Sequence, residues 1–180
     1  MFLLPEGEGL LESRYWVIMT NNGRGDNERP GLELPTLPPV IFGVPVLVGV
    51  VVHLLLWDAG IIGGILGVVI GVVLVLVGLG MIAWSFVTMR AYGEHPEPGH
   101  PTKTLVVSGP FRRTRNPIYV GFLLIAAGLA VAFNALAVLI AAFVGAVALT
   151  VLVIRREEAY LTREFGEAYT GYMSRTPRWL

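Results

Sequence analysis

A basic segment that leads directly into an apolar run is the part of this sequence best suited to chemistry. It holds Arg112, Arg113 and Arg115, followed by Asn116 and Pro117. Asn is a favoured helix N-cap and Pro fits the first helical position, so we predict a helix beginning at Pro117. Unpaired N–H groups at a helix start attract anions, and guanidinium groups suit carboxylate and phosphate. The segment therefore predicts an anion-binding site.

The same arginines have a second interpretation, in which they only fix the orientation of a membrane helix. A second polar segment distinguishes the two interpretations, because Glu157 and Glu158 follow the last apolar run of the chain. A scaffold that only needs orientation has a use for positive charge and none for paired carboxylates. The two segments read together favour an active site.

Four short pieces in fixed order carry a family resemblance. They are 103–109, Arg115-Asn116-Pro117-x-Tyr119, 155–161 and 165–169. With these pieces, residues 84–180 resemble the isoprenylcysteine carboxyl methyltransferase family and its relatives, the membrane phospholipid methyltransferases. The resemblance implies an S-adenosylmethionine-dependent methyltransferase acting on a lipidic or small hydrophobic acceptor.

The resemblance also implies which residues form the site, with the cofactor between the central loop and the tail. Carried over position by position, the cofactor-binding residues are Lys103, Thr104, Leu105, Val106, Phe111, Asn116, Pro117, Tyr119 and Glu157. The expected catalytic residues are Arg115, Asn116, Tyr119 and Glu158. Arg112, Arg113 or Arg115 would orient a carboxylate acceptor, and Tyr119 or Glu158 would help an amine lose its proton.

Two positions depart from the family pattern. Asn116 stands where the eukaryotic enzymes have histidine, so no imidazole is present there to carry a proton. Val153 stands where the prenylcysteine enzymes have an arginine that binds the substrate carboxylate. The sequence therefore leaves the acceptor open among carboxylate, amine and thiol. The alternative function is a non-catalytic four-helix membrane scaffold or subunit.

Composition indicates an integral membrane protein. Of 180 residues, 54% are hydrophobic and only 14% are charged, which is far more apolar than a soluble domain. The formal net charge of zero gives no basis for binding nucleic acid. Cysteine is absent, which excludes disulfides and thiolate ligands, and we predict no metal site from His53, His95 and His100.

Four apolar runs predict an all-α protein with four transmembrane helices, at 37–57, 61–89, 117–133 and 135–154. The last helix should continue into a charged tail until Gly166 or Gly171. We expect 103–108 to form a short β-like segment. In the second helix, Gly63, Gly67 and Gly71 repeat every fourth residue, which predicts close packing against a neighbouring helix. His53, inside the first helix, is interpreted as structural.

All Lys and Arg residues fall in the leader, the central loop or the tail. This distribution predicts a cytoplasmic location for both termini and for the active site, in the cell inner or plasma membrane. We divide the chain into a mobile leader at 1–35, two membrane helices at 36–89 and a methyltransferase core at 90–180. Met19 is a possible alternative start, and the oligomeric state is left open.

Overall fold

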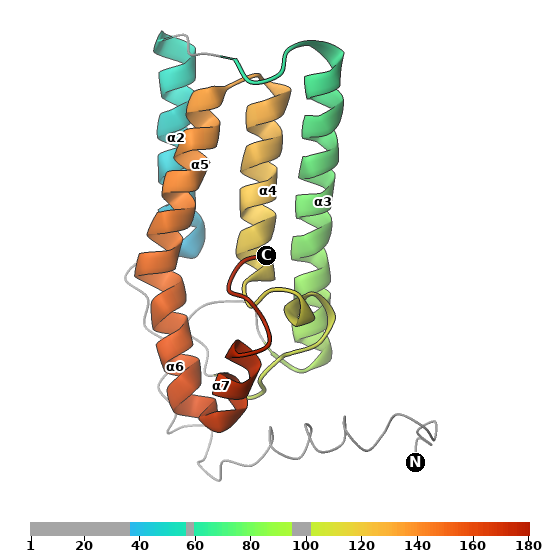
Figure 1. The fold of residues 1–180 in the computed structure, drawn as a ribbon, viewed down its shortest axis with the longest axis vertical. Helices are drawn as coiled ribbons and strands as arrows, with labels where there is room; N and C mark the ends of the chain where they lie inside the picture. Colours follow the sequence, from blue (N-terminus) through green and yellow to red (C-terminus); the bar gives the residue numbers. More distant parts are fainter. Residues whose placement is uncertain (1–36, 57–59, 95–101) are drawn as a thin grey trace.

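The computed structural model describes residues 37–56, 60–94 and 102–180, and every regular element in these ranges is helical (Figure 1). The expected leader lies outside the described residues, as do His95 and His100. The long apolar helices and the shorter elements at their polar end are α2 (Pro38–Leu56), α3 (Gly64–Ala91), η2 (Gly109–Arg112), α4 (Pro117–Ala132), α5 (Leu136–Leu149), the π-helix η3 (Thr150–Ile154), α6 (Arg155–Phe165) and α7 (Glu167–Met173).

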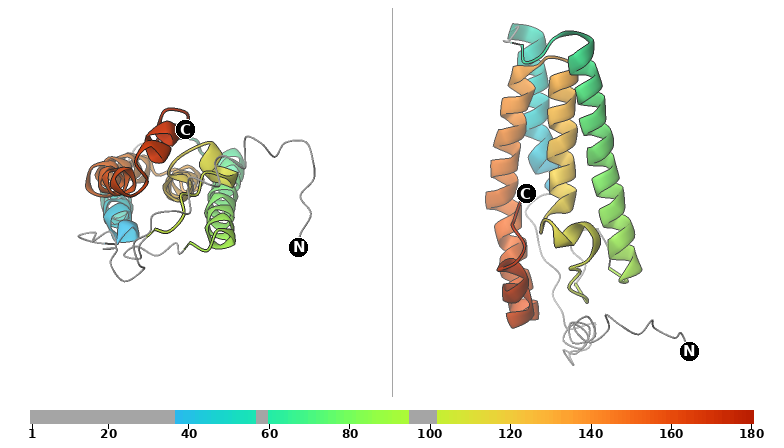
Figure 2. Two further views of the ribbon diagram at one scale, coloured as in Figure 1. Left: turned by 90° about the horizontal axis from the view of Figure 1, so that it is seen from below. Right: turned by 45° about the vertical axis from the view of Figure 1, so that its right-hand side comes forward.

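The predicted apolar helices are confirmed within a few residues of their expected bounds. Three helices in the described ranges are long and apolar enough to cross a membrane, namely α2, α3 and the continuous helix Leu136–Phe165. At 16 residues, α4 is shorter, and it lies between α3 and α5 (Figures 1 and 2). The predicted continuation of the last helix is also confirmed, and it ends where Gly166 adopts a φ of 53°.

Glycine allows α3 and α4 to approach closely. A Cβ on Gly71 would lie 2.5 Å from the carbonyl oxygen of Gly128, and one on Gly78 would lie 2.8 Å from that of Gly121. In a membrane, association depends on such backbone proximity because lipid tails are as apolar as the side chains. The predicted packing role is confirmed for Gly67 and Gly71. It is wrong for Gly63, which precedes α3 and has no neighbour within 4 Å of an added Cβ.

A second close pair of helices is formed by α2 and α5. A Cβ on Gly49 would lie 2.6 Å from the Cβ of Ala141, and one on Gly145 would lie 2.9 Å from the Phe42 ring. At the far end of the bundle, the turn between α4 and α5 places Asn134 at a φ of 55°, where its side-chain oxygen accepts the N–H of Ile61. This bond ties that turn to the segment that precedes α3.

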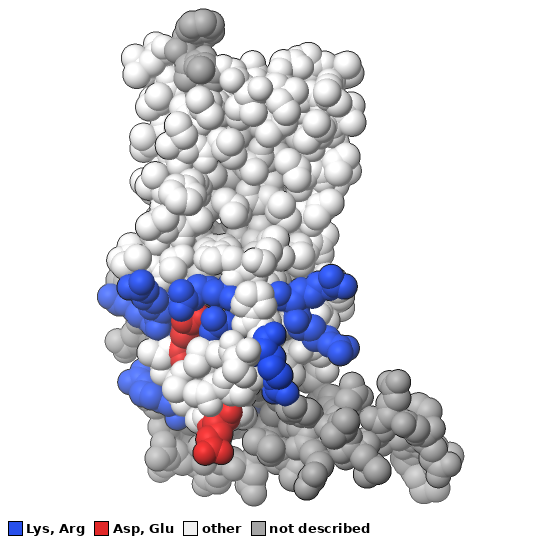
Figure 3. Space-filling view, viewed as in Figure 1, with Lys and Arg blue, Asp and Glu red and all other residues white. Residues whose placement is uncertain are grey.

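The polar parts of the chain gather at the other end of the bundle. The loop 102–116, α6, α7 and the C-terminus all lie there, although they are far apart in sequence (Figure 1). On the face drawn in Figure 3, Lys and Arg form a band around this end, and the apolar part of the bundle carries no charge. The tail therefore turns back onto the central loop, and Tyr172 bonds to Phe111 there.

The predicted β-like segment at 103–108 is wrong, because the structure has no strand there. A strand needs a partner to take its N–H groups. Here the carboxylate of Glu94 accepts the N–H groups of Lys103 and Thr104 instead, the first at 2.8 Å.

Gly71→Ala should lower the stability of the bundle. The new methyl group would press on Gly128 and on Ala132, and overpacking of this kind costs about 1–3 kcal/mol. Gly80→Ala is the matched control, since it lies in the same helix with nothing within 4 Å of an added Cβ. Thermal unfolding in detergent should show a lower Tm for Gly71→Ala alone. Equal Tm values for the two variants would contradict the packing described here.

Candidate active site

The start of α4 is the fixed side of the candidate site. The helix begins at Pro117 with Asn116 in the N-cap position, as the sequence predicts. The expected capping bond is not made, because the Asn116 side chain does not bond to the first turn of the helix. Instead its Nδ2 donates to the carbonyl oxygen of Arg178, at 2.9 Å. The amide therefore holds the C-terminal segment against the helix.

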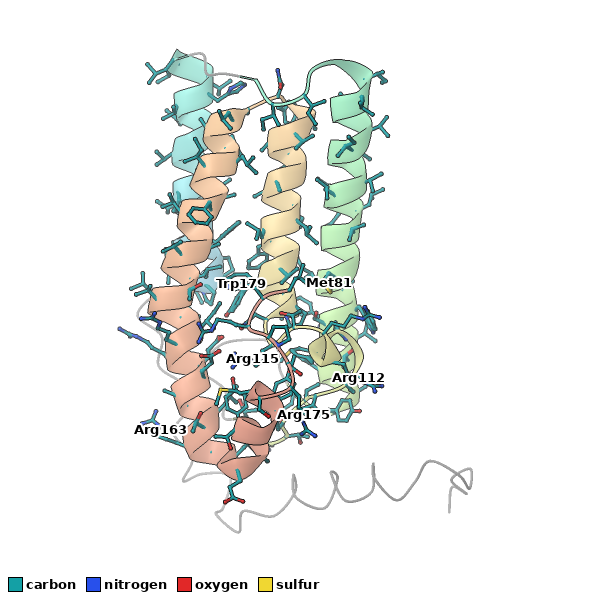
Figure 4. The ribbon with its side chains drawn as sticks, viewed as in Figure 1. Met81, Arg112, Arg115, Arg163, Arg175 and Trp179 are labelled. Carbon is teal, nitrogen blue, oxygen red and sulfur yellow. The ribbon has the colours of Figure 1, made fainter. Side chains whose placement is uncertain are left out.

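Two further hydrogen bonds attach the C-terminal segment to the same place. The N–H of Arg115 donates to the carbonyl oxygen of Pro177 at 2.9 Å, and the Thr114 hydroxyl donates to that of Arg178 at 3.1 Å. Thr114 is fully buried, and such buried bonds are costly to lose. Trp179 then packs against the apolar cluster that contains Tyr119. Figure 4 labels Trp179 and Arg115 at this end of the bundle.

Glu157 and Tyr119 join the tail to α4. The hydroxyl of Tyr119 donates to Oε1 of Glu157 at 2.8 Å. Tyr119 is buried in the apolar cluster, so this bond forms where water has little access. The contact unites two residues that the sequence assigned to the cofactor pocket from segments 38 positions apart.

The π-helix η3 explains why Glu157 faces inward. In a continuous α-helix, a step of seven residues returns to the same face, and from the fully buried Leu149 that step reaches Arg156. A π turn takes one extra residue. The step from Leu149 therefore becomes eight residues and reaches Glu157, while Arg155 and Arg156 are exposed. Because of the π turn, the carboxylate of Glu157 faces the interior in place of the guanidinium of Arg156.

Glu158 is held by two arginines. Arg178 binds it as a fork, with Nε 2.9 Å from Oε1 and Nη2 2.6 Å from Oε2. Nη1 of Arg115 lies 2.8 Å from the same Oε1. The hydrogen bonds to Glu158 raise the pKa of Arg178, which keeps that guanidinium charged.

Arg115 is the one arginine of the predicted cluster that turns inward. Its side chain is 11% exposed, whereas Arg112 and Arg113 are exposed. Its Nε and Nη1 atoms are buried without a hydrogen bond, so the approach of Nη1 to Glu158 is an ion pair whose N–H is not aimed at the oxygen. Burial, and then the charge of Glu158, raises the pKa of the neighbouring Tyr169, so that phenol is neutral.

The loop residues assigned to the cofactor pocket lie against the tail. Leu105 is buried in a cluster with Tyr169 and Tyr172, and Val106 is also buried. The hydroxyl of Tyr172 donates to the carbonyl oxygen of Phe111 at 2.6 Å. Burial raises the pKa of Tyr172 well above its usual range, which keeps this donor protonated. The loop and the tail therefore form one packed unit.

The structure brings the expected catalytic residues and Glu157 together as two adjacent groups. Tyr119 bonds to Glu157, and Arg115 and Asn116 connect to Glu158, the first directly and the second through Arg178. Pro117 is buried at the helix start, and Lys103 and Thr104 lie farther along the loop, where they contact Glu94.

Sequence reasoning missed Glu94 and Arg178. Glu94 stands alone beside a Pro-rich stretch, and Arg178 is one of several arginines in the tail. One signal could have indicated Arg178. It follows Pro177, and a proline disfavours continuation of the helix, so the chain changes direction before Arg178. In the described residues, no cluster of His, Asp and Glu could hold a metal ion.

Comparison with known proteins identifies the family. A family model described as phospholipid methyltransferase matches residues 66–168, which is more than half of the chain. The chain belongs to the phospholipid methyltransferase family. The match covers α3 from residue 66 onward, α4, α5 and α6, with both carboxylates, and it ends before Arg178. No curated protein and no solved structure matches the chain.

The hydrogen bond between Tyr119 and Glu157 can be measured by a double-mutant cycle. We expect Tyr119→Phe and Glu157→Gln to couple by about 1 kcal/mol or more in unfolding free energy, because a buried bond to a carboxylate is lost in both variants. Tyr119→Phe paired with Glu167→Gln is the control, since Glu167 is exposed on α7. Additivity in both pairs would show that the bond contributes nothing.

Proposed function

We propose that this member of the phospholipid methyltransferase family uses S-adenosylmethionine and transfers its methyl group to a lipidic or small hydrophobic acceptor. One observation carries the proposal: Glu157 and Glu158 are both held against the start of α4, the first by Tyr119 and the second beside Arg115. The group that accepts the methyl is a carboxylate, an amine or a thiol. A membrane scaffold has no use for two carboxylates beside an arginine whose buried Nε and Nη1 atoms make no hydrogen bond.

The residues present fit S-adenosylmethionine. The buried Nε and Nη1 atoms of Arg115 lack hydrogen-bond partners and suit the carboxylate of that cofactor. Glu157 has a second oxygen, Oε2, besides the one bonded to Tyr119, and it suits an ammonium or hydroxyl group. The N–H groups of Lys103 and Thr104 are already bonded to Glu94, so the loop would contribute its carbonyl oxygens and side chains.

Bound S-adenosylmethionine would supply an electrophilic methyl group on a sulfonium. The protein's part is positioning, which can lower the barrier by several kcal/mol, of order 7–11 in the best cases. Tyr119 and Glu157 would fix the cofactor side, and Phe111 and Pro117 would support the wall of the pocket. Asn116 holds the C-terminal segment and carries no proton between reactants.

The structure changes the role that we propose for Glu158. The sequence suggested a proton acceptor for an amine substrate, but both oxygens of Glu158 are bound by Arg178. We therefore propose that Glu158 holds Arg178 at this end of the bundle, and that an amine acceptor would lose its proton to another group. A carboxylate acceptor is already ionised near pH 7 and needs no base.

The proposed architecture has four spans, of which α4 is the third in chain order, and the polar end faces the cytoplasm of the cell inner or plasma membrane. The support is the band of arginines at that end, since basic residues favour the cytoplasmic side (Figure 3). A soluble cofactor would enter from the cytoplasm, and an apolar acceptor would enter from the bilayer. At 16 residues α4 fits a locally thinned bilayer or close contact with α3 and α5.

Calorimetry of S-adenosylmethionine and its demethylated product with the detergent-purified protein tests the proposal. We expect micromolar binding, and a loss of at least about tenfold in affinity in Glu157→Gln, because the charged acceptor is removed. Glu167→Gln removes the same charge from an exposed position and should bind normally.

No binding by a folded wild-type preparation would contradict the methyltransferase proposal and favour the scaffold. Equal affinity in wild type and Glu157→Gln would remove Glu157 from the site while leaving the cofactor in place.

A further inference from the structure

The carboxylate of Glu158 contacts two guanidinium groups, those of Arg178 and Arg115, and the geometry of the two contacts differs. Arg178 takes both oxygens of Glu158 in a fork with bonds of 2.9 and 2.6 Å. Arg115 approaches one of these oxygens to 2.8 Å without a directed hydrogen bond. The neighbouring carboxylate of Glu157 accepts a hydrogen bond from Tyr119 and none from Arg115. The carboxylate is therefore oriented toward Arg178.

Stability alone would favour hydrogen bonds to Glu158 from the more buried guanidinium, and the structure has the reverse. The Arg178 side chain is 35% exposed and could be solvated by water, yet it has the better bonds. Arg115 is 11% exposed, and two of its nitrogen atoms are buried without a hydrogen bond. A buried guanidinium N–H that makes no hydrogen bond is costly, even beside a counter-ion. Such a group in a native protein needs an explanation, and a ligand is one.

The position of Arg178 is fixed by the backbone. Its carbonyl oxygen accepts from both Thr114 and Asn116, on either side of Arg115 in the sequence. The Arg178 side chain therefore reaches Glu158 from a backbone segment that is anchored beside Arg115. Arg178 and Arg115 compete for this carboxylate. Arg178 lies beyond residues 66–168, so the family match assigns it nothing.

We propose that Arg178 is a positioning residue that engages Glu158 and so keeps the buried guanidinium of Arg115 available for an oxyanion of a ligand. The inference rests on the proposed function for the identity of that ligand. The oxyanion is a carboxylate or a phosphate, from the amino-acid part of the cofactor or from a lipid headgroup. Without Arg178, Glu158 would turn to Arg115 and occupy its donors.

The test is the order of affinities in three variants, measured by calorimetry with S-adenosylhomocysteine as the probe. Arg178→Gln should bind about tenfold or more weakly, since Arg115 loses a charge-assisted contact. The double variant Arg178→Gln with Glu158→Gln should recover most of the loss, because the competing carboxylate is gone. Arg178→Lys should be intermediate, as an ammonium cannot form the fork. Arg163→Gln, an exposed arginine on α6, should bind as wild type.

A comparison of probes identifies the source of the oxyanion. Methylthioadenosine lacks the amino-acid carboxylate, so a cofactor carboxylate at Arg115 predicts that Arg178→Gln leaves its affinity unchanged. A lipid phosphate predicts instead that Arg178→Gln changes the KM for a phospholipid acceptor and leaves S-adenosylhomocysteine binding unaltered. Stabilisation of the wild type by inorganic phosphate, lost in Arg178→Gln and regained in the double variant, tests the anion receptor independently of any nucleoside.

The outcomes separate the two claims. If the double variant is no better than Arg178→Gln in every arm, Arg178 has a merely structural role and the inference is wrong, even with cofactor bound. If the wild type binds neither nucleoside but the phosphate arm follows the expected order, the cofactor proposal is wrong and the anion receptor stands. If phosphate also fails, both are wrong.

Discussion

The attachment of the C-terminal segment to the start of α4 is the interaction on which the polar end depends. The carbonyl oxygens of Pro177 and Arg178 receive bonds from Arg115, Thr114 and Asn116. These bonds place the Arg178 fork on Glu158 and Trp179 in the apolar cluster. Three further contacts join the loop and the tail: the bond between Tyr119 and Glu157, the ion pair between Arg115 and Glu158, and the bond from Tyr172 to Phe111.

Helix packing and the π turn determine where the tail meets the start of α4 and which of its side chains face α4. Glycine contacts between α3 and α4 and between α2 and α5 bring the helix backbones close together, so each pair can act as a rigid unit. The π turn of η3 then rotates the end of the fourth helix so that Glu157 faces Tyr119.

The sequence predicts the helices well because the signals are local: long apolar runs, Pro117 at a helix start and Gly166 at a helix end. It predicts the site residues through motifs, and it fails where a bond joins distant segments. The Asn116 side chain was expected to cap its own helix, but it bonds to Arg178, 62 positions away. Likewise, no periodic pattern indicates that Glu94 replaces a strand partner for the loop. Such choices depend on which groups meet in three dimensions.

The central claim is that this network transfers a methyl group. The most direct test supplies S-adenosylmethionine with a labelled methyl group to the purified protein in lipid bilayers and follows the label into the extracted lipid fraction. The account predicts labelled lipid with wild type and little with Tyr119→Phe combined with Glu157→Gln. Tight binding of the cofactor with no label in any lipid or small hydrophobic acceptor, or equal labelling by the double variant, would contradict it.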